Sequence, residues 1–188
     1  MRASPDPDPT TPAAADPGLM FREAMRRPAN AVAVIAARDG ARRAGLTATA
    51  VCSLSDAPPS LLVCVNRAGP ALETIRAAGR FSVNYLTEAQ VELAALFAGR
   101  AGRFGAEKFD EGAWIEGPDA AGEAGAPMLS GALAAFDCVL EEVVEHATHA
   151  ILIGHVARLT VEETPGSLVY SAGGFCAATP LDGAGRAA

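Results

Sequence analysis

The amino-acid sequence predicts a mainly β fold, an antiparallel barrel with peripheral helices, and three observations lead to this class. Six or seven runs of apolar and β-branched residues are separated by turn signals, as is typical of strands. Most of these runs follow one another through connections short enough to be hairpins. The two or three helical segments do not alternate regularly with the strands, as they would in a doubly wound parallel sheet.

The first half of the chain begins with a proline-rich tail, followed by a helix and three strands. Residues 1–18 contain five prolines and little apolar surface, so we expect them to be disordered. Pro28 ends the next helix, and Asp39-Gly40 is a strong hairpin signal between the first two strands. Pro58-Pro59 precedes a third strand, whose unbroken apolar run LLVCV predicts burial on both faces. The expected ranges are 19–27 for the helix and 31–37, 44–54 and 61–65 for the strands.

The second half adds two helices and four strands. Gly79 closes the first helix, and Thr87 is the expected N-cap of the second. Residues 99–126 form a long loop. Its sequence contains one cluster of aromatic residues: Phe104, Phe109 and Trp114. The two longest strands are joined by the short segment 145–148, so they should be antiparallel. The expected ranges are 71–78 and 88–98 for the helices and 81–86, 133–144, 149–161 and 167–170 for the strands, before a flexible tail at 179–188.

Composition and charge exclude several classes of function. The net charge of −7 argues against nucleic acid as the main partner. No apolar stretch reaches the roughly 18 residues that a membrane helix needs. Residues 1–18 lack the apolar centre of a signal peptide, so we expect a cytoplasmic location. Cys52, Cys64 and Cys138 lie in apolar runs, as reduced cysteines of a core do.

The sequence contains no motif for nucleophilic, phosphate-binding or metal chemistry. A GxxxxGK[ST] loop, a GxGxxG turn after a strand and a GxSxG elbow are all absent from the 188 residues. His146 and His149 are three residues apart, a spacing that would place them on opposite faces of a strand. No third ligand lies nearby, so we expect no metal site.

The expected strand 44–54 offers the first candidate site. In an extended strand Thr47 and Thr49 face one side, and Ala48 and Ala50 face the other. Such small residues leave room for a flat ligand beside hydroxyl and backbone N–H donors. The alternative is a tightly packed strand without a ligand.

Three further positions carry polar groups where a ligand could meet them. Asn66-Arg67 ends the apolar strand LLVCV and is suited to a phosphate, the alternative being a solvated turn. Asn84 lies in the middle of a strand, where it needs partners if it is buried, and is either structural or a ligand contact. His149 begins the apolar strand HAILIGHV and is either structural or functional.

In their order and spacing, several segments together resemble the flavin reductase-like family, the small reductase components of two-component flavin-dependent monooxygenases. The resemblance covers about residues 20–178, which indicates one domain over 19–178. The segments are FREAMRRPANAVAVIAA, RAGLTATAVCSLSDAPPSLLVCVNR, IRAAGRFSVNYL, ELAALFAG, KF with a later Trp, GAPML with FDC, THAILIGHV and LVYSAGGF.

This resemblance implies a six-stranded antiparallel split β-barrel of Greek-key type with peripheral helices. It implies a homodimer with flavin near the subunit interface. It also implies an NAD(P)H:flavin oxidoreductase, in which NADH or NADPH reduces FMN or FAD by direct hydride transfer and the reduced flavin supplies a partner monooxygenase. Because the two cofactors carry this reaction, the absence of a catalytic triad or metal motif agrees with it.

The resemblance also assigns roles to residues. The segment 47–53 would lie along the isoalloxazine ring and ribityl chain, and Asn66 and Arg67 near the flavin phosphate. Lys108 matches a usually basic position near the phosphates. His149 matches a histidine that would orient the nicotinamide or steady charge on the reduced flavin. The expected cofactor-binding residues are Asn30, Thr47, Ala48, Thr49, Ala50, Ser53, Asn66, Arg67, Asn84 and Lys108, and the expected catalytic residue is His149.

Two segments depart from the family pattern. Serines usually follow the Asn-Arg pair, but here the loop at 68–71 reads Ala-Gly-Pro-Ala, so backbone N–H groups of the next helix would have to replace two hydroxyls. Pro28-Ala29-Asn30 stands where the family reads close to Ala-Thr-Gly. Two alternatives therefore stay open: a split-barrel flavin carrier or other flavin-dependent oxidoreductase that does not reduce free flavin, and a structural or interaction module.

Overall fold

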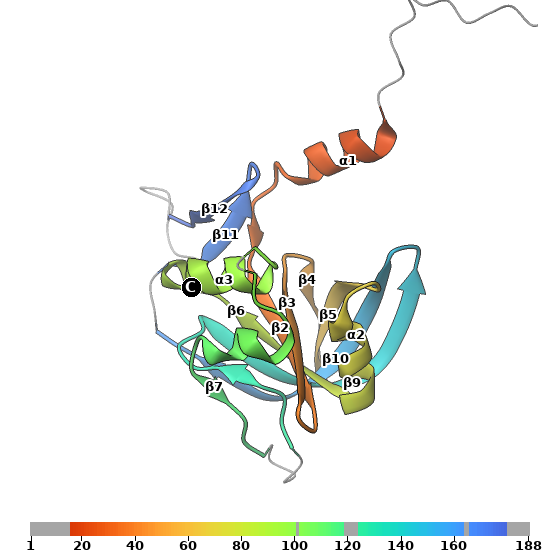
Figure 1. The fold of residues 1–188 in the computed structure, drawn as a ribbon, viewed down its shortest axis with the longest axis vertical. Helices are drawn as coiled ribbons and strands as arrows, with labels where there is room; N and C mark the ends of the chain where they lie inside the picture. Colours follow the sequence, from red (N-terminus) through yellow and green to blue (C-terminus); the bar gives the residue numbers. More distant parts are fainter. Residues whose placement is uncertain (1–15, 101, 119–123, 164–165, 180–188) are drawn as a thin grey trace, which may run out of the picture.

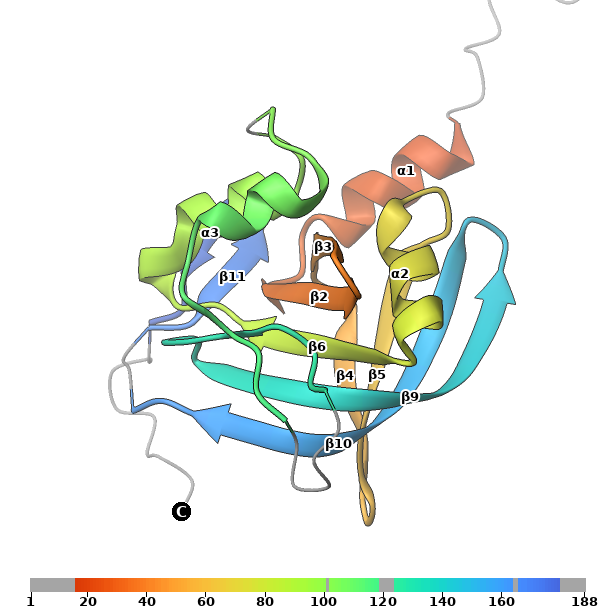
Figure 2. The same ribbon diagram turned by 60° about the horizontal axis from the view of Figure 1, so that its bottom comes forward.

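A single seven-stranded antiparallel sheet forms most of the computed structural model, which describes residues 16–100, 102–118, 124–163 and 166–179 (Figure 1). The strand order is β3-β2-β6-β9-β10-β5-β4. Figure 2 shows the sheet curling, with β9 and β10 bending round to run beside β5. The expected mainly β, antiparallel class is confirmed, with seven strands in the main sheet instead of six. The bounds are β2 (Ala33–Asp39), β3 (Arg42–Ala48), β4 (Val51–Asp56), β5 (Pro59–Asn66), β6 (Arg80–Tyr85), β9 (Ala134–His146) and β10 (His149–Val161).

The additional strand arises because the run expected as one strand, 44–54, is two. β3 pairs with β2 up to Ala48, and the chain then switches partner through Thr49 and Ala50. From Val51 onward, β4 pairs with β5 instead. The prediction of one continuous strand is wrong, because no glycine or proline marks the switch. One run of sequence therefore joins the two edges of the sheet.

The helices follow their local signals closely. Gly79 takes a left-handed conformation (φ 63°) after α2 (Pro70–Ala78), as its lack of a side chain allows. Thr87 forms the predicted N-cap through a capping box with Gln90, although the first turn is a 3₁₀ segment, η1 (Glu88–Gln90), ahead of α3 (Val91–Phe97). A second 3₁₀ segment is η2 (Gly105–Asp110). Among the described residues, no helix is long and apolar enough to cross a membrane.

The N-terminal helix, α1 (Pro17–Met25), begins earlier than expected. Pro17 occupies the first turn, where its missing N–H is not needed, and the Asp16 side chain accepts a hydrogen bond from the Gly18 N–H. The expected disordered tail is therefore wrong at residues 17 and 18, while residues 1–15 lie outside the described part of the chain.

Two small sheets complete the fold. The first contains β1 (Asn30–Ala31), β11 (Leu168–Ser171) and β12 (Gly174–Ala177). The last of these strands was not expected from the sequence. The second pairs β7 (Trp114–Ile115), inside the segment 99–126 that the sequence indicated as a loop, with β8 (Met128–Leu129) just after that segment. Residues 180–188 of the expected flexible tail lie outside the described residues.

Strand β2 lies between two cores and is buried on both faces. Val34 and Ala36 of β2, and Val32 just before it, face the cluster that includes α3, and alternate residues of β2 face the barrel interior. The aromatic cluster beside α3 contains Phe97, Phe109 and Trp114. Phe104, the third aromatic residue of the segment 99–126, is 71 % exposed and lies outside this cluster.

One face of the sheet stays partly open. Leu61, Val63 and Val65 of β5 are buried, but Leu62 and Cys64 are only half-buried, so the expected burial on both faces is wrong for the single chain. Cross-strand pairing places apolar residues of β4 and β10 on the same side as Leu62 and Cys64. We call this set the outer face: Cys52, Leu62, Cys64, Ile151 and Ile153.

The cysteines do not share one environment. Cys138 is fully buried as expected, and burial raises the pKa of its thiol to about 12. Cys64 is half-buried on the outer face, and burial raises its pKa as well. Cys52 is exposed on the edge strand β4, so its expected place in the core is wrong.

Candidate functional site

Several of the sequence-predicted residues meet at one corner of the sheet. His149, the first residue of β10, is the direct cross-strand partner of Asn66, the last residue of β5. The Ala50 carbonyl accepts a 3.0 Å hydrogen bond from the Cys64 N–H, which brings the switch between β3 and β4 beside the same end of β5. Thr49, Ala50, Asn66 and His149 are all exposed. The corner therefore presents polar groups from three separate parts of the chain to solvent.

Arg67 extends this corner towards helix α2. Its guanidinium donates to the Ala147 carbonyl at 2.8 Å and lies 2.5 Å from a carboxylate oxygen of Glu145. The other Glu145 oxygen lies 2.5 Å from Arg76. The hydrogen bond from Arg76 and the charge of Arg67 hold the pKa of the Glu145 carboxyl below its usual value. Two guanidinium groups thus share one carboxylate here, and Glu73 adds a second carboxylate beside them.

The start of helix α2 lies next to Arg67 and has free donors. Gly69 is the N-cap and supplies no side-chain hydrogen bond to the first turn. Pro70 has no N–H, so the donors of this end are those that follow it. A cavity of about 410 Å³ is lined by this loop and by Arg67 and Arg76. Free N–H groups at a helix start beside arginines fit an anion such as phosphate.

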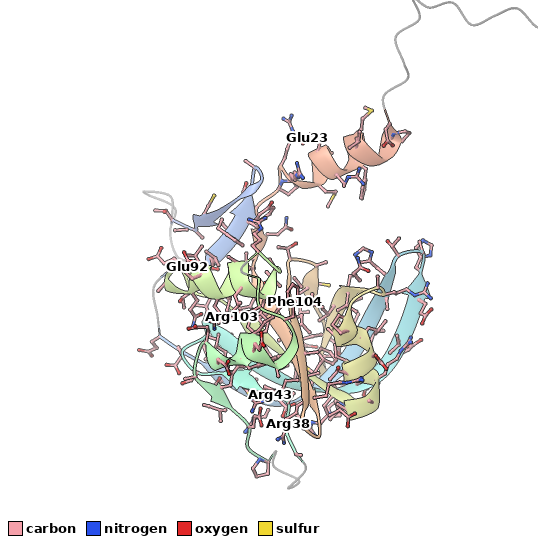
Figure 3. All side chains as sticks on the ribbon, viewed as in Figure 1. Glu23, Arg38, Arg43, Glu92, Arg103 and Phe104 are labelled. Atoms are coloured by element: carbon pink, nitrogen blue, oxygen red, sulfur yellow. The ribbon has the colours of Figure 1, made fainter. Side chains whose placement is uncertain are left out.

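A second cavity, of about 430 Å³, lies on the other side of the same loop. Arg42 and Arg43 of β3, the start of α2, the end of α3 and Lys108 of η2 line it. Figure 3 shows Arg43 projecting from β3 and Phe104 on the segment that connects α3 to η2. Both cavities therefore share one helix start and are bordered by cationic side chains.

Lys108 stands at the edge of the second cavity. Its Nζ donates to the Phe97 carbonyl at 3.4 Å and lies 5.6 Å from the centre of the Phe97 ring. Partial burial lowers the pKa of the Lys108 amine, because an apolar environment disfavours the charged form. The Lys108 amine therefore loses its proton more readily than that of an exposed lysine.

His149 is exposed, and its Nδ1 lies 2.8 Å from the Thr148 hydroxyl oxygen. This contact leaves Nε2 available to a ligand. His146 is the cross-strand partner of His149, so the two side chains point to the same side of the hairpin. The expectation that they lie on opposite faces is wrong, because their spacing spans the turn and not a continuous strand.

Other predicted residues lie away from this corner or make contacts inside the protein. Asn84 is fully buried, and its amide donates to the Val34 carbonyl and accepts from the Leu129 N–H. These contacts favour the structural role of the two that the sequence left open. The Thr47 hydroxyl donates to the Ala94 carbonyl of α3 at 2.7 Å, and Ala48 is buried in the barrel core. The predicted alternation of Thr47 and Thr49 on one strand is wrong, because β3 ends at Ala48.

Asn30 and Ser53 stand at the margins. Asn30 is on β1 and donates to the Pro28 carbonyl. Ser53 is exposed on β4. The sequence patterns do not single out Glu145, Arg76, Arg42 or Arg43, whose side chains set the charge around the two cavities. In the sequence these four residues are marked only by their charge and by their position next to a turn or in a helix, and many surface residues share both features.

The comparisons with known proteins agree on one family. Residues 25–179 match the flavin reductase like domain. The chain is similar to an FMN reductase (NADH), RutF, from Stutzerimonas stutzeri, with 40% identity over 150 residues that cover 80% of this chain and 82% of the relative. It is also similar to the reductase component of 4-hydroxyphenylacetate 3-monooxygenase from Salmonella typhimurium, with 35% identity over 81% of this chain and 86% of the relative. Among solved structures, BorF, the flavin reductase component of a bacterial two-component tryptophan halogenase, superposes with a TM-score of 0.77, 28% identity, and coverage of 87% of this chain and 99% of BorF.

Proposed function

This chain belongs to the flavin reductase-like domain family, and from that premise we propose that it uses NADH or NADPH to reduce FMN or FAD by direct hydride transfer. The reduced flavin would then supply a separate monooxygenase, as expected for the reductase component of a two-component system. The observation that carries this proposal is the 40% identity to an enzyme named FMN reductase (NADH) over most of both chains. A cytoplasmic location, where NAD(P)H is made, is part of the same proposal.

The basic corner and its cavities fit the phosphate of a flavin. Arg67, Arg42, Arg43 and Lys108 surround the uncapped start of α2, although Glu73 pairs with Arg42 and Glu116 with Arg43. A phosphate there would accept from N–H groups that no side chain satisfies. These backbone donors would replace the hydroxyls that the loop lacks. Bound flavin and nicotinamide would supply the hydride transfer itself.

The protein would orient the flavin and nicotinamide rings and exclude water from the space around them. Thr49 and Ala50 present small side chains and backbone at the exposed switch between β3 and β4, so a flat ring system can approach them closely. His149 would donate or accept through Nε2, with its ring orientation held by the Thr148 hydroxyl. This contact suits a residue that positions the nicotinamide or steadies negative charge on reduced flavin. The role of His149 is thus one of positioning at the cofactors.

A homodimer is part of the proposal, and the outer face supports it. Apolar residues on two adjacent strands, such as Leu62 and Ile153, are half-exposed, and their contact with water is unfavourable. Asn66 and His149 lie on the same side of their strands as this face, two residues beyond Cys64 and Ile151. A second copy that covers the outer face would therefore border the candidate site.

The test is oxidation of NADH and of NADPH by purified protein in the presence of excess FMN, FAD or riboflavin, followed by nicotinamide absorbance. We expect NAD(P)H consumption that depends on added flavin and continues over many turnovers in air. A protein that holds one flavin without oxidising NAD(P)H would favour the carrier alternative. That alternative is raised by the loop at 68–71, which lacks the usual hydroxyls. A protein that neither binds nor reduces flavin would refute both.

A further inference from the structure

The helix α1 projects away from the rest of the protein. Figures 1 and 2 both show it held out from the barrel by the segment that leads into β1. None of its residues is buried, and its large apolar side chains are more than half exposed: Leu19 58%, Met20 60%, Phe21 66% and Met25 54%. This is the largest group of exposed apolar side chains on any described helix.

A helix in this position needs a surface to pack against. It has nine residues, and isolated helices shorter than about 12–15 residues are marginal in water. Its own polar contacts are weak, such as the exposed pair of Glu23 and Arg26 at 3.6 Å. A hydrogen bond from the Ser171 hydroxyl to the Arg27 carbonyl fixes only the point where the chain leaves the body.

The two sides of α1 differ in character. At 3.6 residues per turn, Met20, Phe21, Ala24 and Met25 share one side, which we call the arm face. The opposite side carries the charged residues Arg22, Glu23 and Arg26, together with Leu19. Figure 3 shows the side chains of α1, including Glu23, projecting clear of the barrel. An apolar side of this kind on a helix indicates a docking surface.

Charge indicates what the helix docks on. Residues 22–27 carry three arginines and one glutamate, whereas the whole chain has a net charge of −7. The rest of the protein is therefore strongly acidic and attracts this basic segment. The same acidity repels an anionic membrane, the other common partner of a basic amphipathic helix.

We propose that α1 is an arm that docks its arm face onto a second copy of this chain. In a two-fold dimer the exchange is reciprocal, so each subunit gives one arm and receives one. The partner's outer face offers a matching surface, since Ile151 and Ile153 lie beside Glu142 and the 41 % exposed Val144 of β9. Apolar side chains there would cover the arm face, while Arg22 and Arg26 on the opposite side of α1 would stay in contact with solvent. This inference rests on the homodimer in the proposed function.

The test compares two variants of α1 in the full-length protein by sedimentation over a range of concentrations. Met20→Ser with Phe21→Ser removes the centre of the arm face. Leu19→Ser is the matched control, because it removes a similarly exposed apolar side chain from the opposite side of the same helix. We expect the double variant to raise the dimer dissociation constant at least a hundredfold, or tenfold for each of the two arms. The control should stay within about twofold of the wild type.

Two further measurements separate the possible outcomes. Hydrogen exchange of the α1 amides should slow as wild-type protein dimerises, and a variant lacking residues 1–25 should dimerise as poorly as the double variant. If the wild type is a stable dimer and the α1 variants dimerise equally well, docking of α1 on the partner is refuted. The proposals of a homodimer and of a reductase are not affected by that result. A wild-type monomer at all concentrations would overturn both arm and homodimer, and the NAD(P)H assay would still judge the reductase. Binding of α1 to vesicles of phosphatidylcholine and phosphatidylglycerol, with dimerisation unaffected by the variants, would assign the helix to a membrane instead.

Discussion

Replacing Asn84 with alanine should lower the free energy of unfolding and leave flavin binding intact. The Asn84 amide donates to the Val34 carbonyl at 3.0 Å and to the Ser82 hydroxyl at 2.9 Å, and it accepts from the Leu129 N–H at 2.8 Å. Asn84→Ala leaves the Leu129 N–H without a partner in a site that water does not reach. A stranded buried donor costs about 1–3 kcal/mol, and each lost hydrogen bond about 1 kcal/mol. The expected loss of unfolding free energy is about 3–5 kcal/mol, a large part of the roughly 5–15 kcal/mol typical of a domain.

The assay pairs urea unfolding with FMN titration, and Asn66→Ala serves as the matched control. The Asn66 side chain is exposed and accepts only a local hydrogen bond from the Ala68 N–H, so its removal should cost less than about 1 kcal/mol of stability. Because Asn66 lies at the candidate site, Asn66→Ala should weaken FMN binding, and Asn84→Ala should not. If Asn84→Ala kept the wild-type unfolding free energy but lost affinity for FMN, the buried amide would be a ligand contact and the reasoning would be wrong.

Three further predictions concern the candidate site. Arg67→Ala should weaken FMN binding roughly tenfold or more by removing a charged donor to the phosphate, with riboflavin binding unchanged. Arg103→Ala, which removes an exposed arginine paired with Glu111, is its control, and equal losses for FMN and riboflavin would contradict the phosphate role. His149→Ala should slow flavin reduction in stopped-flow measurements and raise the apparent KM for NADH while FMN affinity is kept; unchanged turnover and KM would remove His149 from the site. Burial lowers the pKa of Lys108, and the side chain is charged below that pKa and neutral above it. As the pH is raised, FMN affinity should therefore fall earlier in the wild type than in Lys108→Arg, whose side chain keeps its charge. Identical pH profiles for the two proteins would count against a phosphate contact by Lys108.

The candidate site shows how far sequence reasoning reached. The residue pattern and the family resemblance indicate Asn66, Arg67 and His149, and the register of β5 against β10 brings Asn66 and His149 side by side. Asn84 and Thr47 were selected on the same grounds, but their polar groups bind backbone carbonyls within the protein. The sequence pattern around a polar residue in a strand is the same whether that residue binds a ligand or a neighbouring segment of the protein. Only the positions of the neighbours separate the two cases.

The ion pair of Arg67 illustrates a second limit. Glu145 lies far from Arg67 in sequence, and the two meet because β10 returns beside β5. Nothing local distinguishes Glu145 from the other acidic residues of β9. The charge balance around a phosphate site therefore depends on contacts that a single sequence does not reveal.

Interactions between residues close together in the chain account for the local elements. The cap at Thr87, the left-handed Gly79, the hairpin at Asp39-Gly40 and the two long strands of 134–161 all follow from steric preferences and hydrogen bonds within a few residues of each other. The tertiary structure alone decided where the run 44–54 changes partner, which side of Leu61–Val65 stays open and which residues meet at the basic corner. These features depend on strand register and on burial between segments distant in sequence, and local preferences carry no information about either.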